Sequence, residues 1–157
     1  MSERTAARIV LPGGLLPTIA AVRILLVSVG KVRDPYVDDV AHYAKHLRGR
    51  ANVEQIEVKD AAAALKRIPD GATTVVLDVL GKQLGSEEFA QFIGERQREG
   101  KTLCFVIGGA DGISVPNPDH MISFGPITLP HQLARVVLLE QLFRAHSILA
   151  GEPYHRA

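Results

Sequence analysis

Short apolar runs alternate with amphipathic stretches along the chain from residue 22 onward. Residues 22–29 are almost continuously Val, Ile and Leu, as expected for a strand that is covered on both faces of a sheet. Four further apolar or β-branched runs predict strands over residues 53–58, 73–80, 103–107 and 121–124. Because amphipathic stretches separate these runs, the pattern predicts an α/β fold with a mostly parallel sheet and helices on both faces.

The ends of the predicted helices are marked by capping and turn residues. Asp34 followed by Pro35 places a carboxylate before a proline at the first helical position, so a helix should run to about Leu47. Ser86 is placed to cap a helix that Gly100 closes. Two more helices are predicted over residues 61–68 and 131–149.

The predicted C-terminal helix leaves little of its surface polar. A helix that is apolar on nearly all sides must be buried on nearly all sides, and in so small a domain a second copy would supply part of that burial. The pattern therefore predicts a two-fold dimer, with Glu140 and Arg144 paired on the remaining polar edge. The apolar positions are Leu133, Val136, Val137, Leu138, Leu139, Leu142, Phe143, Ile148 and Leu149.

Residues 1–21 precede the first predicted strand and are interpreted as an N-terminal extension. Two arginines lead into an apolar stretch over residues 9–29, which is typical of a signal peptide, but prolines and glycines break it and Arg23 charges it. We expect neither export nor a membrane span. The extension should be disordered, or reflect the assumed start of translation, and the rest of the chain should be a single domain over residues 22–157.

Composition fits an ordinary globular domain and limits how the chain could bind nucleic acid. The 157 residues are 46% hydrophobic and 22% charged, and the net charge of +1 gives no strong field toward RNA. RNA binding would therefore need a local patch; the alternative is a solvated helix face, and Asp34, Asp38 and Asp39 partly offset the charge. The candidate patch comprises Lys31, Arg33, Lys45, Arg48 and Arg50, with His42 and His46 between them.

The single cysteine, Cys104, lies within the predicted strand over residues 103–107 and is interpreted as a small buried hydrophobic residue. One thiol cannot form an intramolecular disulfide, which fits a reducing cytoplasm. No Cys/His spacing is typical of a zinc site, so we expect no metal.

Two loops in the last third of the chain indicate a cofactor pocket. Residues 108–112 read Gly-Gly-Ala-Asp-Gly directly after a buried strand, where glycines let the backbone turn sharply and approach a ligand. Residues 125–130 contain two prolines that stiffen a loop whose backbone groups can read a ligand edge. Both loops, and Asp78, lie where ligands collect in parallel sheets, at the carboxyl ends of strands.

Several motifs in combination resemble the RlmH family of the SPOUT class of RNA methyltransferases. The resemblance extends over residues 22–157 and depends on the combination, since the glycine loop alone would be unspecific. The motifs are Val27-Ser28-Val29-Gly30-Lys31, Leu77-Asp78-Val79-Leu80-Gly81-Lys82, Ile107-Gly108-Gly109 with Gly112, Ile127 to Val136, Glu140 to Ala145 and Pro153-Tyr154-His155-Arg156.

The resemblance implies a C-terminal trefoil knot, which is a rare exception among folds, and a homodimer. It also implies S-adenosyl-L-methionine as cofactor and methylation of N(3) of a pseudouridine in large-subunit ribosomal RNA of the assembled ribosome. Tyr154, His155 and Arg156 would bind the substrate, across the dimer. The implied cofactor contacts are Leu77, Asp78, Gly109, Gly125, Pro126, Ile127, Thr128, Leu129 and Pro130.

One departure concerns the glycine loop. Relatives often carry Pro-Glu where this chain has Ala110-Asp111, which keeps the acid but shortens its reach.

The implied reaction has a demanding nucleophile. Methyl transfer from a sulfonium needs positioning and no metal, but an imide nitrogen must first lose its proton to a base, or be stabilised as an anion by nearby donors. His155 or Arg156 is the first candidate for this work, followed by Arg135 and His131, with Asp111 last.

Structural roles remain open for the same side chains. His131 could cap the final helix, and Asp78 could be a turn residue at a strand end. Arg135 and Arg144 could form salt bridges in the dimer, and Tyr154 could anchor the tail by packing.

Two other functions are compatible with parts of the sequence. A nucleotide-dependent oxidoreductase would use the glycine loop for a pyrophosphate, but residues 108–112 lack the G-x-G-x-x-G spacing and follow the fourth predicted strand instead of the first. A non-catalytic dimeric ribosome-binding factor would not need the second loop or the C-terminal tail, both of which are intact.

Overall fold

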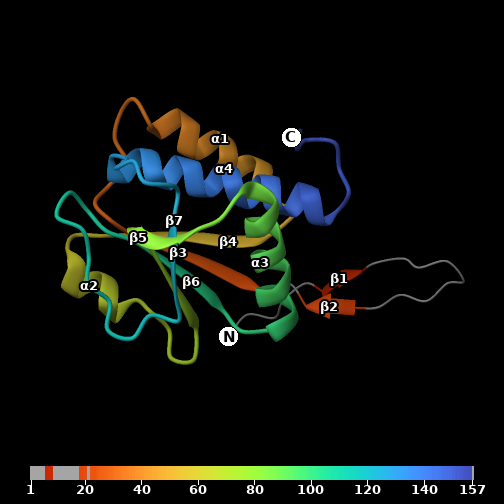
Figure 1. Cartoon of the computed structure of the whole chain (residues 1–157), viewed down its shortest axis with the longest axis horizontal. Helices are drawn as coiled ribbons and strands as arrows, with labels where there is room; N and C mark the ends of the chain where they lie inside the picture. The colour runs from red at the N-terminus through yellow and green to blue at the C-terminus, as the bar shows by residue number, and fades with distance from the viewer. Residues whose placement is uncertain (1–5, 9–17, 21, 157) are drawn as a thin grey trace, which may run out of the picture.

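A five-stranded parallel sheet with helices on both faces organises the chain (Figure 1), which confirms the predicted α/β class. The computed structural model describes residues 6–8, 18–20 and 22–156. The sheet has the order β4-β3-β6-β5-β7. Its strands are β3 (Arg23–Val29), β4 (Asn52–Val58), β5 (Thr73–Gln83), β6 (Leu103–Ile107) and β7 (His120–Ser123). The helices are α1 (Val37–Leu47), α2 (Ala61–Lys66), α3 (Ser86–Glu99) and α4 (His131–Leu149).

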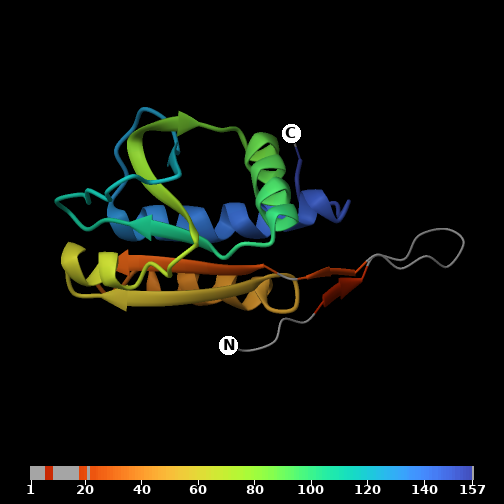
Figure 2. The ribbon, with the colours of Figure 1, turned by 90° about the horizontal axis from the view of Figure 1, so that it is seen from below.

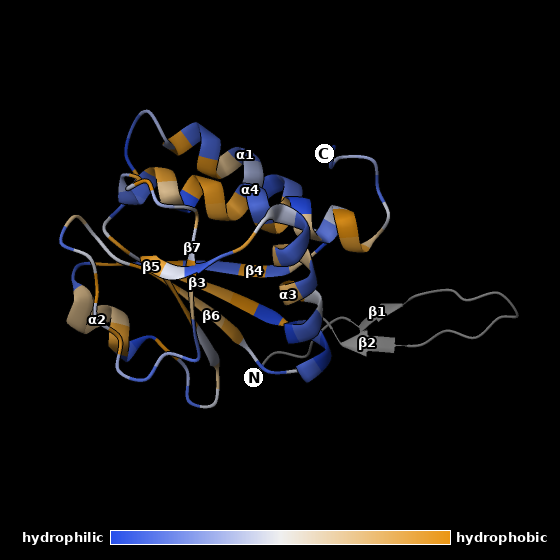
Figure 3. Cartoon of the chain, viewed as in Figure 1, coloured by the Kyte–Doolittle hydropathy of each residue, from blue (hydrophilic) through white to orange (hydrophobic). Residues whose placement is uncertain are grey.

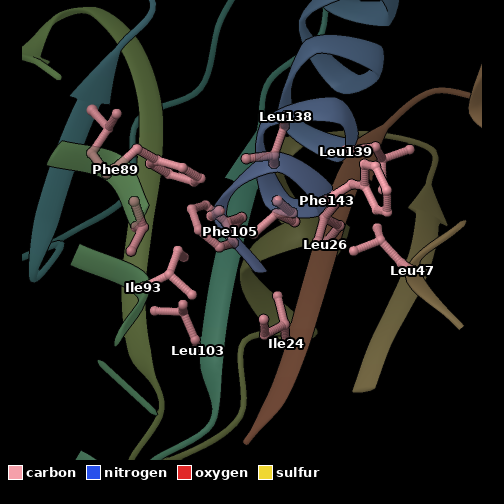
Figure 4. Packing of buried hydrophobic residues seen from close by; sticks show 14 of the residues in the cluster. Ile24, Leu26, Leu47, Phe89, Ile93, Leu103, Phe105, Leu138, Leu139 and Phe143 are labelled. Atoms are coloured by element: carbon pink, nitrogen blue, oxygen red, sulfur yellow. The ribbon is translucent and has the colours of Figure 1, made fainter. Parts of the chain in front are cut away.

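Alternate residues of the central strands build two separate cores. Ile24 and Leu26 of β3 belong to the cluster that contains residues of α1, α3 and α4, which packs around Phe105 (Figure 4). Leu25 and Val27 belong to the opposite cluster, which α2 covers. Figure 1 shows α1 and α4 on one side of the sheet and α2 on the other, and Figure 2 shows the strands of the sheet side by side. Burial on both faces explains why the strands are apolar throughout.

Helix α4 has the predicted bounds and crosses the middle of the larger core. Three leucines on it are completely buried, and its apolar residues are spread around the helix (Figure 3). Leu133 and Val137 are only half-buried and belong to neither core cluster. One stripe of the helix is therefore left without a core contact within the chain, and the dimer predicted to cover it stays a prediction.

Strands β5 and β7, which are neighbours at one edge of the sheet, approach each other closely. Strand β5 continues past its predicted end to Gln83 and pairs with β7 twice, at Val75 to Leu77 and again at Lys82 and Gln83. Between these stretches Gly81 touches β7, and a Cβ there would lie 2.6 Å from the backbone nitrogen of Ile122. Only glycine fits this crossing. The trefoil knot implied by the resemblance stays a prediction.

The start of α1 differs from the prediction. The Asp34–Pro35 peptide bond is cis, and Pro35 is not the first helical residue. The amide of Tyr36 donates to the carbonyl of Arg33 at 2.8 Å, which closes a turn, so the helix begins at Val37 without a side-chain cap.

The start of α3 also differs, because Ser86 is its first helical residue and not its cap. The hydroxyl of Ser86 donates to the side-chain oxygen of Gln141 at 2.7 Å. Gly85 is the N-cap, and the Glu88 carboxylate accepts its amide proton at 3.0 Å. The acid three residues into the helix therefore does the capping that we assigned to serine.

The N-terminal extension contains two short strands, β1 (Ala6–Arg8) and β2 (Thr18–Ala20), which pair antiparallel outside the main sheet. The other residues of 1–21 lie outside the described part of the chain, so the disorder of the extension stays a prediction. Among the described helices, none has the length and apolarity needed to cross a membrane.

Candidate functional site

A cavity of about 640 Å³ lies at the carboxyl ends of β5 and β6, closed by the loop between β7 and α4. It brings together Asp78, the glycine loop and the second loop. The sequence predicted each of these at the carboxyl end of a strand. Pro126 is the one predicted cofactor contact that is absent from the lining. The lining residues are Leu77, Asp78, Val79, Ile107, Gly108, Gly109, Ala110, Gly112, Ile113, Ile122, Ser123, Phe124, Gly125, Ile127, Thr128, Leu129, Pro130, His131 and Ala134.

The glycine loop folds back on itself at the floor of this cavity. The amide of Gly112 donates to the carbonyl of Gly109 at 2.9 Å. A Cβ on Gly108 would lie 2.7 Å from the backbone carbon of Gly112, and one on Gly109 would lie 3.2 Å from Val29. The loop can therefore close only because Gly108 lacks a side chain, whereas a Cβ on Gly109 would press on the Val29 side chain.

The second loop is held by its own strand end. The Ser123 hydroxyl donates to the carbonyl of Gly125 at 2.8 Å, and its oxygen accepts the Gly125 amide proton at 3.1 Å. Several apolar side chains line the cavity, among them Leu77, Ile122 and Ile127, the last of which is 66% exposed. The cavity therefore has apolar side-chain walls with backbone groups between them, a lining that suits an organic ligand with polar edges.

Two of the predicted site residues have structural contacts at the cavity wall. Asp78 lines the cavity, and its Oδ1 accepts the Leu80 amide proton at 2.8 Å, as expected of a turn residue. His131 is the first residue of α4 and lines the cavity, while Pro130 is the N-cap. The imidazole lies over Gly30, where a Cβ would be 3.7 Å from Nε2. His131 therefore forms part of the site and makes no side-chain cap.

Arg135 does not reach the cavity, contrary to its predicted catalytic position. Its side chain is buried against β4, where Nη1 donates to Glu57 at 2.7 Å and Nε donates to Gln55 at 2.9 Å. The Glu57 carboxylate is the physical reason, because a buried guanidinium needs a charged partner and finds it on the neighbouring strand. Arg135 therefore forms its salt bridge within one chain, and the alternative of a salt bridge in the dimer stays a prediction.

The C-terminal tail is fixed to the middle of α4 by charged side chains. Arg144 Nη2 and the Tyr154 hydroxyl both donate to Glu140 Oε2, at 2.7 and 2.8 Å. Burial would raise the pKa of the Glu140 carboxyl, but these hydrogen bonds outweigh it and hold the pKa below its usual value. The Tyr154 ring also packs edge-on against Phe143. The tail is therefore docked, as the anchoring alternative predicted.

His155 has both ring nitrogens directed at charged groups. Arg144 Nη1 lies 3.1 Å from Nδ1, and since arginine can only donate, Nδ1 must accept. Nε2 lies 3.5 Å from a Glu87 oxygen. In this arrangement His155 has no free lone pair with which to act as a base.

The tail and the cavity of one chain lie apart. At about 1.5 Å per residue, the axial distance from His131 to Arg144 along α4 is about 20 Å. Figure 1 shows the tail at the end of the molecule opposite the turn that leads into α4. Tyr154, His155 and Arg156 therefore do not line the cavity of their own chain.

The predicted basic patch is not one surface. Helix α1, about 16 Å long by its residue count, separates Lys31 and Arg33 from Arg48. Arg50 pairs with Glu152 and lies over the ring of Phe143. These basic residues are close together in the sequence, but the helix separates them in space.

Sequence reasoning missed several residues that the structure makes important. Ser123 and Phe124 line the cavity, and their place directly before the second loop could have indicated this. Glu57 and Gln55 gave no sequence signal, because their role depends on the pairing of β4 with β3.

Among the described residues, no cluster of three or more His, Cys, Asp or Glu could hold a metal ion.

Comparisons with known proteins agree with the geometry. The family model described as "Predicted SPOUT methyltransferase" matches residues 22–155. A curated protein of Carboxydothermus hydrogenoformans named ribosomal RNA large subunit methyltransferase H is 39% identical, over 85% of this chain and 99% of its own. Proteins of the same name from Listeria monocytogenes, covering 85% of this chain and 99% of their own, and Nitratidesulfovibrio vulgaris, covering 83% and 96%, are each 40% identical.

Proposed function

Because this chain belongs to the SPOUT methyltransferase family, we propose that it is an S-adenosyl-L-methionine-dependent methyltransferase of large-subunit ribosomal RNA. Its similarity to proteins named ribosomal RNA large subunit methyltransferase H supports the RNA substrate. The acceptor is N(3) of a pseudouridine in the assembled ribosome, and the enzyme acts in the cytoplasm.

The observation that carries this proposal is the cavity between the strand ends and the two loops. Its volume of about 640 Å³ is within the usual range for sites that bind small organic molecules. Leu77, Ile107 and Leu129 give it apolar walls, and the side-chain-free Gly108 and Gly109 let backbone groups approach a ligand. The residues present fit a cofactor that combines a flat heterocycle with polar edges.

When bound, S-adenosyl-L-methionine would supply an electrophilic methyl group. The chain must then orient the acceptor nitrogen and accept its proton. Among the described residues that line the cavity, His131 is the only imidazole, so it is the first candidate for the proton acceptor in this chain. Asp78 is occupied by the Leu80 amide and serves the shape of the loop.

The complete site contains two chains. The tail lies about 20 Å along α4 from its own cavity, so Tyr154, His155 and Arg156 serve the cavity of a partner subunit. The half-buried stripe with Leu133 and Val137 provides a surface for a two-fold contact. In this dimer each tail supplies the cation Arg156, which stabilises the deprotonated nucleobase.

The function is tested by incubating the purified protein and ribosomes with labelled S-adenosyl-L-methionine, and by mapping the label in the RNA. We expect label on a pseudouridine of large-subunit RNA. Binding to ribosomes without label would instead support a non-catalytic factor. Arg156→Ala should keep cofactor affinity, measured by calorimetry, and lose methylation; unchanged turnover would remove Arg156 from the site.

Mixed dimers test whether the site is shared. A Gly108→Ala subunit and an Arg156→Ala subunit should each be inactive with itself. After random exchange of subunits, about a quarter of the sites should combine an intact cavity with an intact tail. Recovered activity near that fraction supports the shared site, while no recovery contradicts it.

A further inference from the structure

An ion pair between the buried Arg135 of α4 and the partly exposed Glu57 of β4 lies behind the cavity wall without lining it. Arg135 is 6% exposed, and its two hydrogen bonds reach Glu57 and Gln55 on β4. Glu57 Oε2 also accepts the amide proton of Val32 at 2.8 Å. Burial would raise the pKa of Glu57, but the hydrogen bonds from Arg135 and Val32 outweigh it and lower the pKa, so the pair is charged at neutral pH.

The same pair fastens the loop of residues 30–36 to the first turn of α4. Val32 of this loop is bound to Glu57, and the amide of Arg33 donates to the side-chain oxygen of Gln132 at 2.6 Å. Gly30, at the start of the loop, lies against the imidazole of His131. The loop, the helix turn and β4 therefore form one connected block around His131.

Stability alone does not account for this arrangement, because an ion pair whose carboxylate is partly exposed to solvent contributes little. Arg135 lies one turn beyond His131, at i+4, on the same side of α4. We infer that Glu57 and Arg135 are positioning residues, which hold His131 and the loop of residues 30–36 at the wall of the cavity. The kinetic part of this inference rests on the proposed function; its structural part does not.

The chain offers a matched control on the same strand, β4. Arg23 on β3 donates to Glu54 on β4 at 2.8 Å, which is another arginine–glutamate pair. Its place at the opposite end of β3 is about 20 Å from the cavity, by the rise of an extended strand. Breaking the control pair removes the same chemical groups without touching the block around His131.

The first measurement is the imidazole NMR signals of His131, which require neither cofactor nor turnover. The chain has six histidines, so the signals of His131 can be assigned by their loss in His131→Ala. Arg135→Met and Glu57→Gln should shift or broaden these signals, and Arg23→Met should leave them unchanged. Unchanged His131 signals in folded Arg135→Met or Glu57→Gln would overturn the inference. Should Arg135→Met fail to fold, Glu57→Gln keeps the test, because it removes the charge opposite Arg135 with almost no change in the size of the side chain.

The second measurement is turnover on ribosomes in two backgrounds. Arg135→Met should lower kcat by about 10-fold or more through misplacement of His131. Arg135→Lys keeps the positive charge but not the planar guanidinium that makes two hydrogen bonds, so it should recover part of the loss. In a His131→Ala background the further effect of Arg135→Met should vanish. Equal losses in both backgrounds, or no loss in either, would overturn the inference. Absence of methylation by the wild-type protein would overturn the proposed function only, since the NMR result stands without it.

Discussion

The two halves of helix α4 organise their surroundings by different means. At its first turn the cavity is shaped by the path of the backbone, through Gly108, Gly109 and the Ser123–Gly125 contact. In its second half the tail is held by charged and aromatic side chains around Glu140 and Arg144. Adding a side chain to the glycine loop should therefore disrupt the cavity. Removing a side chain around Glu140 and Arg144 should instead release the tail.

This difference fits a division of work between the two regions. A cavity built from backbone groups keeps its shape without flexible side chains, which suits the binding of one cofactor. A tail built from a side-chain network fixes the direction of a few polar groups, which suits the orientation of the nucleoside that accepts the methyl group. Variants of the cavity should therefore weaken cofactor binding. Variants of the tail should lower turnover and leave cofactor binding unchanged.

The largest effect is expected from Gly108→Ala. The added Cβ would lie 2.7 Å from the backbone carbon of Gly112, so the loop must move. Overpacking of this kind costs about 1–3 kcal/mol, which corresponds to cofactor binding weakened by roughly 10- to 100-fold in calorimetry. Gly85→Ala is the control, because its φ of −70° suits alanine and the nearest atom to the added carbon is in the flexible Glu88 side chain, at 3.5 Å. Wild-type affinity in Gly108→Ala would show that the loop does not shape the site.

Arg144→Ala should give the reverse signature. It removes two hydrogen bonds to Glu140, one to His155 and the cation–π contact with Tyr154. Loss of tail orientation should lower kcat by about 10-fold or more while cofactor affinity stays at the wild-type level. Arg98→Ala, at an exposed site on α3, is the control. Weaker cofactor binding in Arg144→Ala would mean that the two regions are not separate.

A pH-dependent loss of stability should arise in the second half of α4. His146 is buried; its Nδ1–H donates to the Leu142 carbonyl at 2.7 Å and its Nε2 accepts from Gln97 at 2.9 Å. Burial lowers the pKa of this imidazole below its usual 6.5, and Arg50 adds to the shift. The folded state therefore prefers neutral His146, so its stabilisation is complete above pH 6.5 and is lost as the pH falls below that value.

Thermal unfolding between pH 7.5 and 5 measures this effect. One extra proton taken up on unfolding gives a slope of at most about 1.4 kcal/mol per pH unit. His146→Leu should flatten the curve, whereas the exposed His42→Ala should not. His120, whose pKa is also lowered by burial and by Arg96, leaves a smaller slope in the same direction. An unchanged slope in His146→Leu would contradict the assignment.

The sequence predicted the fold and the cavity well because both depend on local patterns. Apolar runs such as residues 103–107 gave the strands, and glycines directly after a strand gave the loop. It predicted side-chain partners poorly, because those depend on strand order. The motif predicted a catalytic role for Arg135, and only the pairing of β3 with β4 places Glu57 2.7 Å from it.

The C-terminal tail shows the same limit. Its motif implied a role at the site, but the sequence could not show that Tyr154 and His155 dock about 20 Å from their own cavity. That separation follows from the length of α4 and from the place of Glu140 on it. Long-range position had to come from the structure.

The smallest effect is expected from Tyr154→Phe, which tests how the tail network divides its work. The change removes the hydroxyl that donates to Glu140 at 2.8 Å and keeps the edge-on packing on Phe143. Arg144 still holds Glu140, so turnover should fall by only about 3- to 10-fold, the equivalent of about 1 kcal/mol for one partly exposed hydrogen bond. A loss as large as that of Arg144→Ala would show that the hydroxyl, and not the guanidinium, orients the tail.

The same phenol gives the tail an alkaline limit. Burial and the hydrogen bond to Glu140 raise the pKa of Tyr154 to about 12. The docked tail therefore prefers the protonated phenol, so docking is constant below the ordinary pKa of about 10 and weakens as the pH rises from there toward 12. The difference in ultraviolet absorbance between wild type and Tyr154→Phe over this range measures the titration. A midpoint near 10 would mean that the tail is undocked in solution, and the contrast between the two halves of α4 would then depend on the partner subunit.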